Sequence, residues 1–72
     1  MPYSSRKFGL IISTERSARQ MSQEQLSALT GISGGHLAAL ESGKKSPCLI
    51  TFWKLAEALS MKPSQLLAKL ED

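Results

Sequence analysis

The sequence is poor in residues that stabilise a small domain by any route other than helix packing. Its single cysteine excludes an internal disulfide and fits a reducing cytoplasm. Aromatic residues make up only 6% of the chain, so a core of Leu, Ile and Ala is expected, which suits short packed helices better than a β-sandwich. No apolar run is long enough to span a membrane, and the N-terminus lacks the apolar region of a signal peptide. We therefore expect a cytoplasmic protein without a membrane partner.

Length and charge narrow the range of functions further. The 72 residues are enough for one small domain, which we expect to span residues 1–72 with a loose end at about residues 1–4. Nine Lys and Arg against six acidic residues give a net charge of +3. This balance favours a polyanionic partner but does not establish one, because many soluble domains are equally basic.

The strongest local pattern lies in residues 21–47, which predict two short helices joined by a tight turn. Ser22 and Gln25 have the spacing of a capping box, in which each side chain bonds the other residue's backbone N–H. Leu26 and Leu29 are expected to form the apolar face of the first helix. The helix is therefore predicted to begin just after Ser22.

The turn and the second helix are marked just as clearly. Gly31 suits the positive φ of a helix end, Ile32 is an apolar plug, and Ser33 can cap the next helix. Gly43 ends that helix, and Pro47 prevents an early restart. A short helix, a glycine turn and a serine-capped second helix are typical of a helix-turn-helix.

Three further helices are expected around this pair. The first begins at Ser4 or Ser5 and ends near Arg19, the fourth spans Leu49–Leu59, and the last begins at Pro63. The expected apolar face of the first helix consists of Phe8, Ile11 and Ile12, with Glu15 at its partly exposed edge. The face of the fourth helix consists of Leu49, Phe52, Leu55, Ala56 and Leu59. The face of the last helix consists of Leu66, Leu67 and Leu70. The connections are short enough for a compact all-α, five-helix bundle.

This ordered series resembles the Cro/C1-type (XRE, phage-repressor-like) helix-turn-helix family. The matching residues are Arg16, Ser22, Gln23, Leu26, Gly31, Ile32, Ser33, Leu37, Leu40, Glu41, Gly43, Pro47, Leu55, Ala56, Ala58 and Leu59. The resemblance covers about residues 8–67. It implies a lambda-repressor-like fold and a bacterial or prophage DNA-binding transcriptional regulator, repressor-like in character, that binds double-stranded DNA as a homodimer.

The resemblance also implies a structural ion pair. The arginine that matches Arg16 pairs in the family with the glutamate that matches Glu41, which fixes the first helix against the third. A guanidinium and a carboxylate can form two parallel hydrogen bonds. The alternative for Arg16 is a free side chain that contacts DNA phosphate.

Candidate backbone contacts follow from the same resemblance. The glutamine that matches Gln23 clamps the DNA backbone and supports the third helix, and the loop that matches Lys44, Lys45 and Ser46 lies along a phosphate strand. Without the resemblance, Gln23 would be an ordinary surface residue and the loop an ordinary solvated one. The candidate DNA-binding residues are Gln23, Ser33, Gly34, Gly35, His36, Ala38, Ala39, Lys44, Lys45 and Ser46.

The predicted recognition helix, at about residues 34–42, departs from the family pattern. The groove-facing positions match Gly34, Gly35, Ala38 and Ala39, none of which can form a bidentate contact to a base edge. His36 is the one polar ring nearby. It could be a surface residue, a phosphate contact or a base reader. Three consequences are open: the helix lies unusually deep against thymine methyls, DNA shape carries specificity, or the domain is a protein-binding module.

A dimer surface is expected at the C-terminal side of the chain. Trp53 suits either the rim of the core or a dimer contact. Leu66 and Leu70 are candidates for the same surface, although they could instead close the core of the monomer.

Two alternatives to a regulator remain. The same fold could serve as a protein-interaction or antitoxin-like accessory module with weak or non-specific DNA binding. An enzyme could use His36 and Cys48 as a nucleophile pair, but no third orienting group is evident, and Cys48 is expected to cap or begin the fourth helix. A metal site would need more ligands than His36 and Cys48 offer, and no cofactor or small-molecule ligand is expected.

Overall fold

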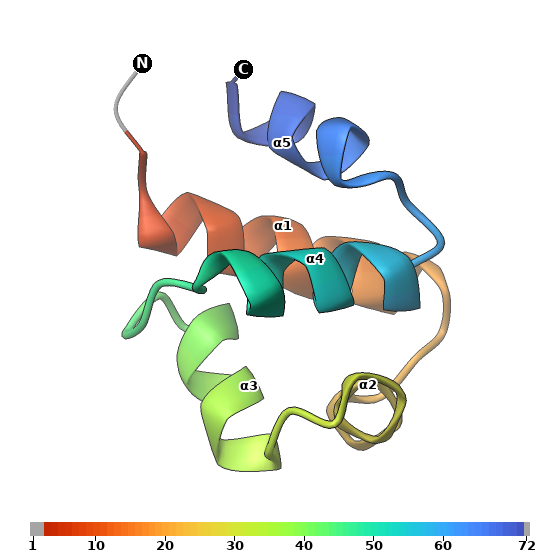
Figure 1. Cartoon of the computed structure of the whole chain (residues 1–72). Helices are drawn as coiled ribbons and strands as arrows, with labels where there is room; N and C mark the ends of the chain where they lie inside the picture. Colours follow the sequence, from red (N-terminus) through yellow and green to blue (C-terminus); the bar gives the residue numbers. More distant parts are fainter. Residues whose placement is uncertain (1–2, 72) are drawn as a thin grey trace.

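The computed structural model describes residues 3–71, whose regular structure is entirely helical (Figure 1). The helices are α1 (Ser5–Ala18), α2 (Gln23–Thr30), α3 (Gly34–Glu41), α4 (Leu49–Ala58) and α5 (Pro63–Glu71). The all-α, five-helix architecture is therefore confirmed. The loose end expected at residues 1–4 lies in part outside the described residues, and Ser4 is the N-cap of α1.

Local signals place the helix ends as expected. The Ser22 hydroxyl accepts from the Gln25 N–H at 3.0 Å, and the Ser22 N–H donates to the Gln25 side chain at 2.7 Å. Ser33 caps α3 by accepting a 3.1 Å hydrogen bond from the backbone N–H three residues further on. Gly31 and Gly43 have φ values of +75° and +83°, a region that glycine enters without steric penalty. These four signals fix the helix-turn-helix locally.

The core is mostly aliphatic and contains buried residues from every helix. In Figure 1, α5 lies on one side of α1 and α4, and α2 and α3 lie on the other. The ring centroids of Phe8 and Phe52 are 5.8 Å apart and link α1 to α4. The buried apolar residues are Phe8, Ile12, Leu26, Ile32, Leu37, Leu40, Leu55, Ala56, Leu59 and Leu66.

One prediction for α2 is wrong, because Leu29 is exposed and Thr30 takes the inward position beside Leu26. The Thr30 hydroxyl donates to the Leu26 carbonyl at 2.8 Å and accepts from the Ile32 N–H at 3.2 Å. Its hydrogen-bonding capacity is thus used within the turn, so a polar residue can be buried there. The inward face of α2 thus consists of Leu26 and Thr30, whereas Leu26 and Leu29 were predicted.

The predictions for Leu49 and Leu67 are also wrong. Leu49 is 73% exposed in the first turn of α4, where Thr51 is buried instead, and Leu67 is exposed because its neighbour Leu66 occupies the core. Together with Trp53 and other side chains of α4 and α5 they line an apolar groove. Its residues are Leu49, Phe52, Trp53, Lys62, Pro63, Ser64 and Leu67.

The expected dimer surface needs a corresponding correction. Leu66 is fully buried in the core of its own chain, so its side chain cannot contact a second molecule. Leu70 is half-buried against the same core. Trp53 is 50% exposed and lies in the apolar groove, so it alone of the three candidates presents a large accessible side chain.

Polar contacts hold α5 against α1. The Lys7 ammonium donates to the Leu70 carbonyl at 3.3 Å, and Glu15 lies 3.3 Å from the Lys69 ammonium and 2.8 Å from the Arg19 guanidinium. The hydrogen bond from Arg19, with a smaller contribution from Lys69, lowers the pKa of Glu15, while burial acts in the opposite sense. Glu15 is thus a partly exposed edge residue, as expected.

No helix within residues 3–71 is long and apolar enough to cross a membrane.

The backbones of α1 and α3 are in direct contact at Gly9, a position that no sequence signal marks. Gly9 is buried in α1, and a Cβ built on it would lie 2.4 Å from the carbonyl oxygens of both Leu40 and Glu41 in α3. Only a residue without a side chain allows this spacing. Gly9 therefore sets how closely α3 packs on α1.

Candidate nucleic-acid interface

The start of α2 places Gln23 beside the end of α3. Because Ser22 caps the helix, Gln23 is the first helical residue and is exposed. Its side-chain amide donates to the Glu41 carboxylate at 3.0 Å. Gln23 is thus held against α3, and the uncapped N–H groups at this end of α2 remain available to an anion.

Arg16 and Glu41 form a bidentate ion pair behind this contact. The Arg16 Nε and Nη2 atoms lie 2.8 and 3.0 Å from the two carboxylate oxygens, and Nη1 donates to the Met21 carbonyl at 2.8 Å. The hydrogen bonds that Arg16 donates to Glu41 raise the pKa of Arg16, against the opposing effect of burial. With its donors directed inward, Arg16 joins α1, α3 and the loop before α2 instead of serving as a free phosphate contact.

The two faces of α3 differ completely. Leu37 and Leu40 are fully buried, whereas Gly34, Gly35 and Ala38 are exposed on the other side. His36 and Ala39 are half-buried at the edges of the exposed face, and Ser33 is exposed at the start of the helix. The exposed face is therefore small and smooth, with His36 as its one polar ring.

The two glycines of this face are not required by the fold. A Cβ at Gly34 or Gly35 would meet no atom within 4 Å, and neither residue has a positive φ. Each glycine nevertheless disfavours helix by about 1 kcal/mol relative to alanine. Gly9 and Gly43 differ from them, since a Cβ at either would collide with backbone.

The loop between α3 and α4, residues 42–48, is called the basic loop. Its first turn folds back on α3, because the Lys44 and Lys45 N–H groups both donate to the Ala39 carbonyl, at 3.0 and 3.3 Å. The side chains of Lys44, Lys45 and Ser46 are exposed. The backbone of the basic loop is thus fixed while its cations project into solvent.

Cys48 stands at the N-cap position of α4, as expected, but does not cap the helix with a hydrogen bond to its backbone. Its thiol lies 3.3 Å from the Thr51 hydroxyl, and hydrogen bonding to Thr51 lowers the pKa of Cys48. The hydrogen-bonding partner of Cys48 is therefore Thr51 and not His36. Within residues 3–71, no three His, Cys, Asp or Glu side chains are grouped to hold a metal ion.

The candidate residues lie on consecutive parts of one surface. Glu41 connects Gln23 at the start of α2 to the end of α3, and the basic loop continues from that end. Sequence reasoning missed Arg6, whose Cα would lie 2.8 Å from a Cβ at Gly43, because the two residues are far apart in the chain.

Comparison with known proteins shows what this arrangement is similar to. A family model described as helix-turn-helix (HTH_3) matches residues 12–66. A Sinorhizobium fredii protein described as an uncharacterized HTH-type transcriptional regulator, y4dJ, is 32% identical over 57 residues, which cover 79% of this chain and 74% of that protein.

Solved structures match over most of the described fold. The restriction-modification controller protein C.AhdI of Aeromonas hydrophila is 34% identical, with a TM-score of 0.82 over 86% of this chain and 94% of its own. An HTH_3 family transcriptional regulator of Vibrio cholerae is 30% identical, with a TM-score of 0.81, and the match covers 89% of this chain but 36% of that one. The clp gene regulator ClgR of C. glutamicum has a TM-score of 0.86 over 99% of this chain and 92% of its own, but at 20% identity it supports the fold alone.

Proposed function

The chain belongs to the HTH_3 family of helix-turn-helix proteins and is a DNA-binding transcriptional regulator, from which we propose that α3 enters the major groove while α2 and the basic loop hold the backbone. The observation that carries this proposal is the exposed face of α3, with Gln23 and the basic loop both placed at the end of that helix. Gln23 and the N-terminus of α2 contact one phosphate strand. Lys44, Lys45 and Ser46 contact phosphates along the basic loop.

The small face supports a deep position of α3 in the groove. Ser33, Gly34 and Gly35 bring backbone close to the base edges, and Ala38 and Ala39 meet thymine methyl groups. His36, at the edge of this face, contacts backbone instead of reading a base. Because no contact within the fold requires Gly34 or Gly35, a close approach by DNA accounts for glycine at these positions.

Gly35→Ala is expected to separate stability from binding. The added methyl meets no atom of the protein, so the free energy of unfolding should rise by up to about 1 kcal/mol. The same methyl enters the space taken by DNA, so affinity for the operator should fall roughly tenfold, within the 1–3 kcal/mol range of one lost base-pair contact. Denaturant unfolding and a binding titration measure the two effects. Unchanged affinity would contradict the deep position and favour readout of DNA shape.

The experiment that tests the function is selection from a random duplex pool at several salt concentrations, followed by titration of the selected duplex. Each lysine that neutralises a phosphate should contribute about 0.9 to the slope of log affinity against log salt. Lys44→Ala and Lys45→Ala should each reduce the slope by that amount. Lys54→Ala, in the middle of α4, removes one charge outside the proposed interface and should leave the slope almost unchanged.

Each outcome of the selection has a defined meaning. An enriched motif whose affinity depends on Lys44 and Lys45 supports a sequence-specific regulator and gives its operator. Salt-dependent binding without a motif would mean that α3 reads little beyond the backbone. An absence of binding at low salt would overturn the proposal in favour of a protein-interaction module, which the exposed apolar groove would then serve.

A homodimer is part of the proposal. The apolar groove between α4 and α5 exposes Trp53, Leu49 and Leu67, and their burial against a second copy would remove a large apolar area from water. A two-fold dimer reads two half-sites about one helical turn apart. The selected motif should therefore be an inverted repeat with that spacing.

The proposed DNA partner also determines the chemistry and the location expected of the protein. The family is one of DNA-binding regulators, and the proposed role uses no catalytic group, cofactor or metal. A bacterial regulator meets its DNA in the cytoplasm, where Cys48 would remain a reduced thiol.

A further inference from the structure

The first turn of α1 is fastened to the start of the basic loop. The Ser5 hydroxyl donates to the Gly43 carbonyl at 3.1 Å. A Cβ at Gly43 would lie 2.8 Å from the Cα of Arg6, so the two backbones are in direct contact. Arg6 is therefore held beside Lys44 by the packing of the fold.

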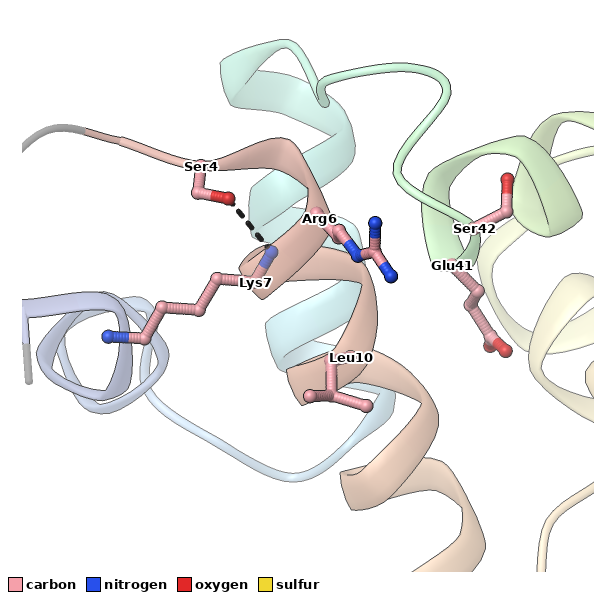
Figure 2. A pocket seen from close by; sticks show the side chains of 6 residues that line it. All are labelled: Ser4, Arg6, Lys7, Leu10, Glu41 and Ser42. Carbon is pink, nitrogen blue, oxygen red and sulfur yellow. Dashed lines mark hydrogen bonds between the residues drawn. The ribbon is translucent and has the colours of Figure 1, made fainter.

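The Arg6 side chain projects into a hollow next to the basic loop. Figure 2 shows its guanidinium between the first turn of α1 and the end of α3, near Ser42 and Glu41. The hollow is lined by Ser4, Arg6, Lys7, Leu10, Glu41 and Ser42. Ser42 is the first residue of the basic loop, so the hollow adjoins the surface proposed to follow a phosphate strand.

The charges around the hollow leave Arg6 without a carboxylate partner. Glu41 is the one acidic residue of the lining, and its two oxygens already accept from Arg16 and Gln23. Within residues 3–71, no carboxylate lies within ion-pair distance of Arg6, whose side chain is exposed. In Figure 2, the Lys7 side chain points the other way, toward α5. Its ammonium donates to the Leu70 carbonyl.

The position of Arg6 within α1 also favours a bound anion. The first turn of α1 contains no acidic residue, although the positive end of the helix dipole favours acids and disfavours cations there. A locally unfavourable choice of residue is expected where a function compensates for it. A phosphate group would satisfy both the guanidinium and the helix end.

We propose that Arg6 is a DNA phosphate contact that extends the footprint of the basic loop onto α1. The inference rests on the proposed function, because it continues the strand contact made by Lys44 and Lys45. A guanidinium can bind a phosphate through two parallel hydrogen bonds. The contact positions the protein on DNA and adds no sequence preference.

Arg6→Gln and Lys54→Gln, titrated against the selected duplex at several salt concentrations, test the proposal with matched changes of charge. Arg6→Gln should reduce the slope of log affinity against log salt by about 0.9. Between 50 and 200 mM salt, the affinity of the variant should therefore fall by a factor about 3.5 times smaller than that of the wild type. The selected motif should not change. Arg6→Lys should restore the slope but not the full affinity, since an ammonium cannot form the bidentate contact.

The outcomes separate this proposal from the one on which it rests. If Lys44→Ala lowers the slope while Arg6→Gln matches Lys54→Gln, Arg6 makes no phosphate contact and the inference is overturned, although DNA binding stands. If the wild-type protein shows no salt-dependent binding, the proposed function itself fails. Denaturant unfolding of Arg6→Gln should give the wild-type midpoint or one slightly above it, because the side chain is exposed and its charge is unfavourable at this end of the helix. A lower midpoint would assign Arg6 a structural role instead.

Discussion

Replacing Glu41 with alanine should remove a large part of the stability of the domain. The substitution leaves the Arg16 guanidinium without its partner at a site where the two side chains are only 16% and 5% exposed. Breaking such a pair by removing one member destabilises a protein by about 3–5 kcal/mol. At roughly 0.05–0.15 kcal/mol per residue, a 72-residue domain has a total stability of about 4–11 kcal/mol, so the variant should unfold at a much lower denaturant concentration than the wild type.

Chemical denaturation of Glu41→Ala and of Glu57→Ala measures this effect against a matched loss of charge. Glu57 is an exposed residue of α4, and its replacement should change the free energy of unfolding by no more than about 0.5 kcal/mol. The double variant Arg16→Met with Glu41→Leu should be more stable than Glu41→Ala, because neither charge is left unpaired. A loss below about 1 kcal/mol for Glu41→Ala would mean that the pair behaves like an exposed surface ion pair.

Gly9→Ala is expected to have the second largest effect, through a single added methyl group. That methyl would lie 2.4 Å from two backbone carbonyl oxygens of α3, and neither can move without moving the helix. Overpacking typically destabilises by about 1–3 kcal/mol, and a collision with backbone belongs at the upper end of that range. The shift would also strain the Arg16–Glu41 pair, which joins the same two helices.

Thermal unfolding should therefore show a midpoint lowered by roughly 10 °C or more, since 1 kcal/mol shifts the midpoint of a domain of this size by about 4–8 °C. Gly35→Ala adds the same atoms to a helix at a position with open space, so its midpoint should rise slightly. Equal midpoints for the Gly9 and Gly35 variants would show that α1 and α3 are packed less tightly than the structure has them.

The parts of the fold that could be predicted from the sequence are those with local causes. Ser22 and Gln25 specify a capping box three residues apart, and Gly31 occupies a conformation that other residues rarely adopt. Such signals operate within one turn of chain, so no knowledge of the tertiary structure is needed. They were enough to predict the limits of the helix-turn-helix.

The inward face of each short helix was harder to predict. Leu29 and Leu49 each lie within one helical turn of a buried residue, but a helix of eight to ten residues has too few turns to define one apolar stripe. The choice between adjacent positions depends on which neighbouring helix is present. Thr30 could replace a leucine because its hydroxyl finds two backbone partners, which periodicity does not reveal.

Contacts between residues far apart in the chain could not be predicted from residue spacing or composition. The pairing of Arg16 with Glu41 was expected because of the family resemblance and not from their separation in the chain. Gly9 resembled any other glycine in a helix until its distance to α3 was known. Arg6 likewise became part of the candidate interface only through its contact with Gly43.

The open space around Gly34 and Gly35 also bears on how such a protein can change over generations. A Cβ introduced at either position would meet no other part of the described chain, so the fold itself does not require glycine there. A single substitution could add a hydrogen-bonding group to the exposed face of α3 while the buried pair of Leu37 and Leu40 keeps the helix in place. With α3 in the groove as proposed, individually tolerated mutations of this face would be a route to altered operator preference.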